Sequence, residues 1–154
     1  MKRRRLLAVA GAALSGSAGC LRRLTADEAD GPPSVDAPTV ELGPGEETTV
    51  TVEAENLGSM QIIATMASAD DPDVPQPSIN LSDATLTPHP NYVQESYPPY
   101  WNWSLPRATV TCEVPISVTG KVPPREYVFT ATVWRSEDRN SEPASDPIRV
   151  RVPE

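Results

Sequence analysis

Residues 108–119 read Ala-Thr-Val-Thr-Cys-Glu-Val-Pro-Ile-Ser-Val-Thr, the clearest structural pattern in this 154-residue chain. Apolar side chains alternate with Thr, Glu and Ser, so one face of the segment is apolar and the other is polar. A period of two is typical of a β-strand that packs one face against a core and leaves the other in water. Pro115 falls on the polar face. Because proline has no N–H to donate, it predicts an edge or a bend there.

The same period recurs along the chain. It is found at residues 39–42, 50–55, 127–135 and 148–152, and residues 60–67 are apolar on both faces, as in a central strand. Turn-forming residues separate these segments at 43–45, 56–59 and 120–125. No helical period is sustained anywhere. Together these segments predict an all-β fold, a single antiparallel β-sandwich of about seven strands.

Two segments resemble the immunoglobulin-like modules of prokaryotic cell surfaces. Residues 50–58 form a strand pattern that ends in Asn-Leu-Gly, and residues 123–133 place a Pro-containing turn before a strand that begins near Tyr127. Arg125 stands where that family usually has Gly. The resemblance implies an immunoglobulin-like sandwich in which the Tyr127 hydroxyl bonds to nearby backbone as a tyrosine corner. It implies a fold rather than a function, because sandwich domains serve many roles.

The first twenty residues resemble an export signal followed by a lipid-attachment motif. A basic start that includes Arg3 and Arg4 precedes a short apolar stretch at 6–14, as in twin-arginine signals. Ser-Ala-Gly-Cys at 17–20 resembles a lipobox, in which the chain is cut before the cysteine and the cysteine receives a lipid. The resemblance implies a lipid on Cys20. Cleavage near residue 17 or 19, with release of a soluble protein, is the alternative.

Residues 21–37 carry few large apolar side chains and no persistent period, which predicts a flexible tether. We therefore expect a signal peptide at 1–19, a lipid-anchored tether at 20–37 and an immunoglobulin-like β-sandwich at 38–154. This arrangement places the domain at the extracellular face of the cell membrane. A secreted soluble form is the alternative.

Acidic residues outnumber basic ones by 21 to 13, which gives a net charge of −8. A chain with this charge is not expected to bind nucleic acid. Its Asp- and Glu-rich composition, with Lys121 as the only lysine after the signal, is similar to that of proteins from halophilic archaea. This resemblance implies a twin-arginine-exported lipoprotein of that group. The single histidine excludes a multi-histidine metal site, and we expect no cofactor.

Residues 68–107 break the alternating pattern, because they are rich in proline and hold most of the aromatic side chains. The proline density predicts loops and short edge strands. The gathered aromatic side chains predict a binding surface for a sugar or a protein anchor, formed by Tyr92, Tyr97, Tyr100, Trp101 and Trp103. Packing in the core is the alternative for the two tryptophans, which share one face if residues 100–104 form a strand.

Other residues carry weaker signals. Asn80 and Asn102 each begin an N-glycosylation sequon. The carboxylates at positions 70, 71, 73 and 83 lack EF-hand spacing, so they predict a solvated acidic loop rather than a Ca²⁺ site. His89, between two prolines, predicts a surface loop and no catalytic triad. Cys112 lies on the apolar face of its strand and predicts a buried, unreactive thiol.

No convergent set of polar residues indicates an active site. We therefore expect no enzyme activity and predict a non-catalytic cell-surface lipoprotein that acts as an extracellular binding or adhesion module. Its expected partners are the membrane, through the lipid anchor, and an unknown envelope protein or glycan. The alternative is a structural subunit or spacer of an envelope assembly.

Overall fold

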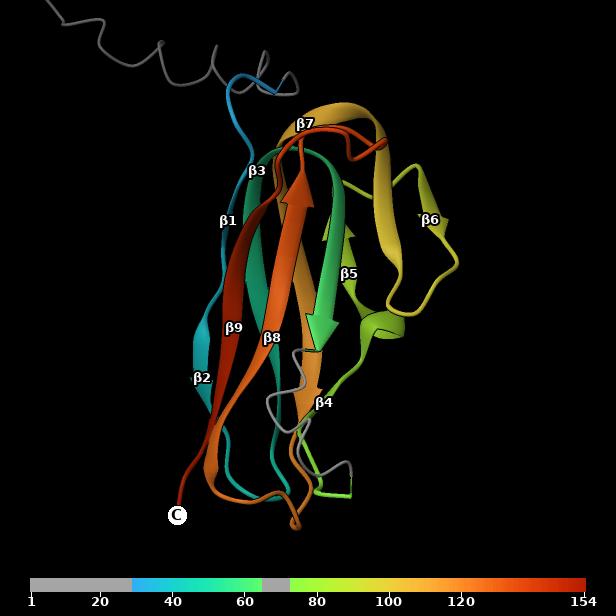
Figure 1. Cartoon of the computed structure of the whole chain (residues 1–154). Coiled ribbons are helices and arrows are strands. Elements are labelled where there is room, and N and C mark those ends of the chain that lie inside the picture. Colours follow the sequence, from blue (N-terminus) through green and yellow to red (C-terminus); the bar gives the residue numbers. More distant parts are fainter. Residues whose placement is uncertain (1–28, 65–72) are drawn as a thin grey trace, which may run out of the picture.

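The computed structural model describes residues 29–64 and 73–154, and the structural statements below concern these residues (Figure 1). They form one β-sandwich of nine strands. The strands are β1 (Ser34–Asp36), β2 (Thr39–Glu41), β3 (Glu47–Ala64), β4 (Ser78–Ile79), β5 (Thr85–Thr87), β6 (Tyr92–Gln94), β7 (Tyr100–Ser117), β8 (Arg125–Trp134) and β9 (Ala144–Val152), with one 3-10 turn, η1 (Leu81–Asp83). The predicted all-β sandwich is confirmed. The short strands β4, β5 and β6 lie in the proline-rich segment, as its composition predicts.

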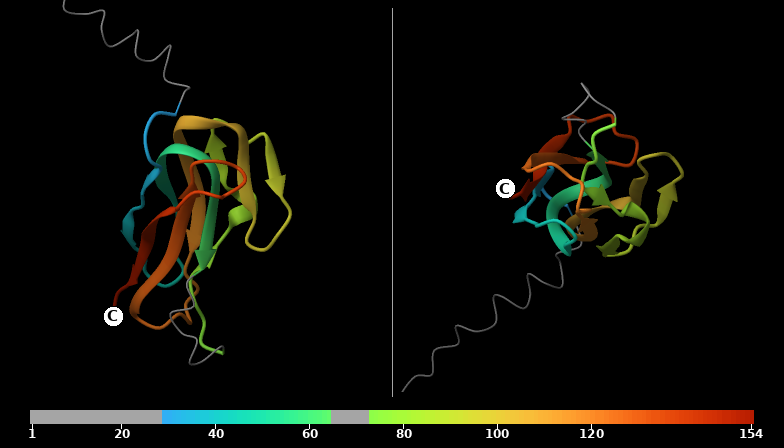
Figure 2. Two further views of the ribbon diagram at one scale, coloured as in Figure 1. Left: turned by 45° about the horizontal axis from the view of Figure 1, so that its top comes forward. Right: turned by 90° about the horizontal axis from the view of Figure 1, so that it is seen from below.

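Two long strands, β3 and β7, belong to both layers of the sandwich. The first half of β3 pairs with β1 and with the second half of β7, whereas its second half pairs with β8 and with the first half of β7. The first layer therefore contains β1, β3, β7, β5 and β4, and the second layer contains β2, β9, β8, β3, β7 and β6. Figure 2 shows the two layers facing each other.

The bend in β3 lies at Gly58, where the sequence pattern predicts a turn. The structure contains a β-bulge there instead, and the strand continues: Asn56 has left-handed backbone angles (φ 57°), and the register with β7 shifts between Leu57 and Ser59. Asn tolerates this conformation better than most residues. A Cβ at Gly58 would lie 2.9 Å from the carbonyl oxygen of Arg135, so only glycine lets the two backbones pass this closely. The Asn-Leu-Gly signal therefore marks a change of layer.

The core lies between the two layers, and the 108–119 pattern contributes one wall of it. Five inward residues of that pattern are buried, as predicted, and Ala108 at its start is half-buried; the five are Val110, Cys112, Val114, Ile116 and Val118. Pro115 lies where β7 changes its outer neighbour, because residues 116–117 pair with β4 and residues 111–113 pair with β5. The missing N–H of Pro115 thus falls beside a gap between two short strands.

Tyr127 forms the tyrosine corner that the family resemblance implies. Its hydroxyl donates a hydrogen bond to the carbonyl oxygen of Pro123 at 2.8 Å. The ring is buried, and the Arg125 guanidinium carbon lies 4.9 Å from its centroid. The corner ties the turn before β8 to the start of that strand.

The folded domain begins before the predicted boundary at residue 38. β1 pairs with β3, and Asn56 holds the segment before β1, accepting a hydrogen bond from the Asp30 N–H at 3.0 Å and donating one to the Pro32 carbonyl at 3.1 Å. A strand of three residues is too short for its alternation to be recognised in the sequence. β2 then pairs with β9 in parallel, which departs from the fully antiparallel sandwich that we predicted.

The outer face of the first layer is acidic. Its strands present five exposed carboxylates, those of Asp36, Glu47, Glu53, Glu55 and Glu113. Asp36 lies directly opposite Glu53 in the β1–β3 register. Like charges in this position destabilise a strand pair.

We predict that Gly58→Ala destabilises the domain by about 1–3 kcal/mol, because the new methyl group would collide with backbone that cannot move aside. Urea unfolding of the wild type and the variant measures the change. Gly120→Ala is the matched control, since no atom lies within 4 Å of a Cβ at that position. Equal stability of the Gly58 variant and the wild type would contradict the close approach.

We also predict that Asp36→Asn stabilises the domain at low salt by about 0.5 kcal/mol, because it removes the repulsion of Glu53. The gain should shrink at high salt, where exposed charges are screened. Urea unfolding at two salt concentrations tests this. Glu154→Gln, at the chain end outside the strands, is the control. An equal gain from the control would show that only net charge matters.

Candidate binding pocket at the open side of the sandwich

A pocket of about 890 Å³ opens between β5 and β6. The segment from β4 to β6 lies on the side of the sandwich away from β1 and β2 (Figures 1 and 2). β5 is at the edge of the first layer and β6 is at the edge of the second, and both pair with β7. The pocket is therefore the mouth of the sandwich between two strand edges.

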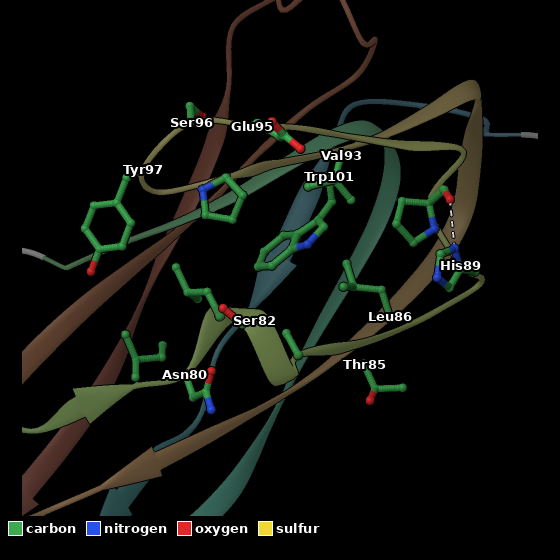
Figure 3. Close-up of a pocket in the computed structure, with 15 residues that line it drawn as sticks. Asn80, Ser82, Thr85, Leu86, His89, Val93, Glu95, Ser96, Tyr97 and Trp101 are labelled. Carbon is green, nitrogen blue, oxygen red and sulfur yellow. Dashed lines mark hydrogen bonds between the residues drawn. The ribbon is translucent and has the colours of Figure 1, made fainter.

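The interior of the pocket is apolar and its rim is polar. Leu86 of β5, Val93 of β6 and Trp101 of β7 converge in it (Figure 3). Leu86 and Trp101 are buried, whereas Val93 is 46% exposed. Further lining residues with polar side chains are Asn80, Ser82, Thr85, His89, Glu95, Ser96 and Tyr97. An apolar pocket with a few polar groups at its rim is the usual form of a binding site.

The pairing of β6 with β7 explains why the pocket receives these side chains. Val93 is directly opposite Trp101, so both project to the same side of the hairpin, toward the pocket. Tyr92 is opposite Asn102, and Gln94 is opposite Tyr100. Because successive residues of a strand point to opposite faces, these four side chains project to the other side.

A second set of contacts fixes that other side of the hairpin. The Arg139 guanidinium lies 4.1 Å from the centroid of the Tyr100 ring and donates hydrogen bonds to Gln94 at 3.2 Å and to Asn102 at 3.5 Å. The Asn102 carbonyl oxygen also accepts a hydrogen bond from the Ser59 hydroxyl at 2.9 Å. The loop between β8 and β9 thus holds the hairpin and keeps the wall of the pocket in place.

The five aromatic residues predicted as one binding surface are divided among three environments. Tyr97 and Trp101 line the pocket, and Tyr97 is 99% exposed. Tyr92 and Tyr100 lie on the other side of the hairpin, where the Tyr92 hydroxyl donates to Glu137 at 3.2 Å. Local desolvation and hydrogen bonding to this carboxylate raise the pKa of Tyr92. Trp103 is fully buried in the core.

The two sequons differ in accessibility. Asn80 is exposed at the edge of the pocket, and its side chain caps η1 by accepting a hydrogen bond from the Asp83 N–H. Asn102 is fully buried, and its amide nitrogen donates to the Tyr100 carbonyl at 3.2 Å. In strand β7 Asn102 lies on the face opposite the two tryptophans, and Arg139 and Ser59 cover that face. The glycosylation prediction at Asn102 is therefore corrected, because the folded chain offers no amide to a glycan.

Cys112 and His89 have the surroundings that the sequence predicts. Cys112 is buried, and desolvation together with the neighbouring Glu113 carboxylate raises the pKa of its thiol to about 12, so the unreactive thiol persists at neutral pH. His89 is an exposed loop residue whose Nδ1 lies 2.9 Å from the Pro90 carbonyl oxygen.

Several predictions concern residues outside the described part of the chain: the export arginines Arg3 and Arg4, the lipid-attachment residue Cys20, and Asp70 and Asp71 of the acidic loop. Among the described residues, no group of three His, Cys, Asp or Glu side chains is placed to hold a metal ion. No helix within residues 29–64 and 73–154 is long and apolar enough to cross a membrane.

Sequence reasoning missed the residues that build the pocket walls. Leu86 is flanked by two threonines, and Val93 is flanked by Tyr and Gln. Both triplets alternate as strands do, but three residues carry too little signal. Arg139 gave no signal at all, since nothing in a polar loop indicates which arginine will contact a distant tyrosine.

The burial of the tryptophans gives a further prediction. In a Trp134→Phe variant, Trp101 and Trp103 are the only indole reporters, and they are 4% and 0% exposed. We expect acrylamide to quench their fluorescence weakly, because it cannot reach buried rings. Urea-unfolded protein is the control for full quenching. Strong quenching in the folded state would contradict the packing of these residues.

Comparison with solved structures finds the same architecture in one other protein and a weaker match to a second. CaCohA2 from Clostridium acetobutylicum, determined in solution, matches with a TM-score of 0.50 and 13% sequence identity over 82% of this chain and 92% of that chain. The third ScaB cohesin of R. flavefaciens, in complex with a group 1 dockerin, matches with a TM-score of 0.44 and 15% identity over 82% of this chain and 98% of that chain. No protein-family model and no curated protein matches the sequence. The chain thus has the fold of an immunoglobulin-like β-sandwich module.

Proposed function

We propose that this chain is a non-catalytic extracellular binding module that recognises a partner protein through the pocket between β5 and β6. The observation that carries the proposal is the pocket itself. Three apolar side chains converge in an opening of about 890 Å³, whereas β1 and β2 cover the opposite long side of the sandwich. Of the three, Val93 is 46% exposed, and an opening with an apolar interior and an exposed apolar group at its edge is the usual form of a surface that a partner covers.

Tyr97 supports a protein partner in particular. Its side chain is 99% exposed at the mouth of the pocket, between Ser96 and Pro98. Tyrosine is enriched among the residues that anchor protein–protein interfaces, because its ring buries apolar area while its hydroxyl keeps a hydrogen bond. An exposed tyrosine beside an apolar pocket is the arrangement that such an anchor requires.

The structural comparison is compatible with this role. CaCohA2, which shares the fold of this chain, has also been solved in complex with a variant of CaDoc0917. That sandwich therefore binds a protein. For the present chain we propose a protein partner on the basis of its own pocket.

We further propose that twin-arginine export and a lipid on Cys20 hold the domain outside the cell. The described segment before β1 lies at one end of the sandwich, and the C-terminus lies at the opposite end (Figure 1). A tether that leaves from the first end would stand the domain with its long axis away from the membrane. The pocket, on a long side, would then face laterally, toward neighbouring envelope proteins.

A photocrosslinking experiment tests the proposed site. We predict that the full chain with Tyr97→p-benzoylphenylalanine, made in its own cells, forms one dominant covalent adduct with an envelope protein. The same replacement at Thr51, on the outer face of β3, should not form it. Mass spectrometry of the adducts identifies the partner. The same set of adducts from both positions, or none from position 97, would contradict a pocket that binds a protein.

The anchor has its own test. We predict that Cys20→Ser moves the protein from the membrane fraction to the medium, because the acceptor of the lipid is lost. Cys112→Ser is the control and should leave the protein in the membrane fraction. Cell fractionation with immunoblotting measures both. Retention of the Cys20 variant in the membrane would refute the lipid anchor.

A further inference from the structure

The two long sides of the sandwich are closed to different degrees. On one side the chain runs from β1, which pairs with β3 of the first layer, directly into β2, which pairs with β9 of the second layer. Hydrogen bonds from the Ala37 N–H to Asp146 at 2.8 Å and from the Arg149 N–H to the Pro38 carbonyl at 3.1 Å hold the crossing point. One extended segment thus bridges both layers and covers the core.

The opposite side lacks such a segment among the described residues. There β5 and β6 each pair with β7, and no other strand of residues 29–64 and 73–154 pairs with their outer edges. The N–H and C=O groups along an unpaired edge can bond to water or to another strand. The pocket lies between these two edges, with Leu86 of β5 and Val93 of β6 projecting into it. Figure 3 shows both side chains beside Trp101.

We infer that the pocket takes an extended segment of the partner protein, which adds as a strand to the free edge of β6. This inference rests on the proposed function. Alternate side chains of an added strand point to one face. One apolar side chain of the segment would therefore enter the pocket against Trp101 and Leu86. The added strand would close this side of the sandwich, as β1 and β2 close the other side. The free backbone edge supplies hydrogen bonds, and the pocket supplies selectivity.

The chemistry of the lining favours a polypeptide over a glycan. A sugar ring stacks on an exposed aromatic face, but the aromatic ring inside the pocket, that of Trp101, is only 4% exposed, and the exposed Tyr97 ring lies at the mouth, outside the apolar interior. The pocket lining contains the acidic side chain of Glu95, and no lysine or arginine of the described residues lines the pocket. The segment should therefore alternate apolar and polar residues and carry a basic residue that meets Glu95.

The test uses displayed random nine-residue peptides, selected against the full chain with Cys20→Ser. We expect selected peptides to alternate apolar and polar residues and to be enriched in Lys or Arg. Val93→Lys, which turns a charge into the pocket, should weaken binding of a selected synthetic peptide at least about tenfold. Thr87→Lys is the matched control, since it places the same charge on an edge strand facing outward, and should change the affinity by less than about twofold.

Two further measurements separate strand addition from other modes of binding. N-methylation of alternate peptide amides should lower the affinity about tenfold at the residues whose N–H meets β6 and leave the others unchanged. Glu95→Lys should weaken binding of basic peptides. Because Glu95 is exposed, this variant replaces Val93→Lys in the binding test if the Val93 variant fails to fold. Thermal unfolding of each variant checks folding.

Selection of no peptide, or peptides indifferent to both Val93→Lys and Glu95→Lys, would overturn the inference, as would equal effects of all N-methylations. If the Tyr97 adduct forms in cells while no peptide binds, the proposed protein partner stands and strand addition falls. If a glycan array shows binding that Val93→Lys abolishes, while no Tyr97 adduct forms, both proposals fail.

Discussion

The close passage of the Gly58 backbone past residues 135–136 is the contact on which the sandwich depends. It allows β3 to bend without ending, so that one strand serves both layers. β7 follows β3 through the bend, because the two strands remain paired on either side of it. A side chain at this point would push the β8–β9 loop away and separate the layers.

The position of the pocket follows from the same bend. Because β7 lies in both layers, the strands on its outer edge also lie in different layers, β5 in the first and β6 in the second. Since β5 and β6 belong to different layers, they do not pair with each other, and an opening lies between them. The Arg139 contacts with Tyr100, Gln94 and Asn102 then hold the β6–β7 hairpin in place, so that the opening is lined rather than collapsed.

The sequence predicted the features that repeat over many residues and missed those that depend on distant contacts. Alternation over residues 108–119 was enough to identify a strand and its buried face, and the position of Tyr127 was enough to identify its corner. The bend at Gly58 was predicted as a turn, because a local signal cannot show whether the chain reverses or changes layer. Asn102 was predicted as a glycosylation site, because the loop that covers it is far away in the sequence. Leu86 and Val93 were missed, because their strands contain only three residues each.

Within the described residues, one long side of the sandwich is closed by the chain itself and the other is open. Amide hydrogen exchange of the full chain, followed by mass spectrometry, distinguishes the two sides. We expect residues 85–97, at the open side, to exchange much faster than residues 34–42, which bridge the layers on the closed side. Equal protection of the two segments would mean that the edges of β5 and β6 are already paired and that this side is not open.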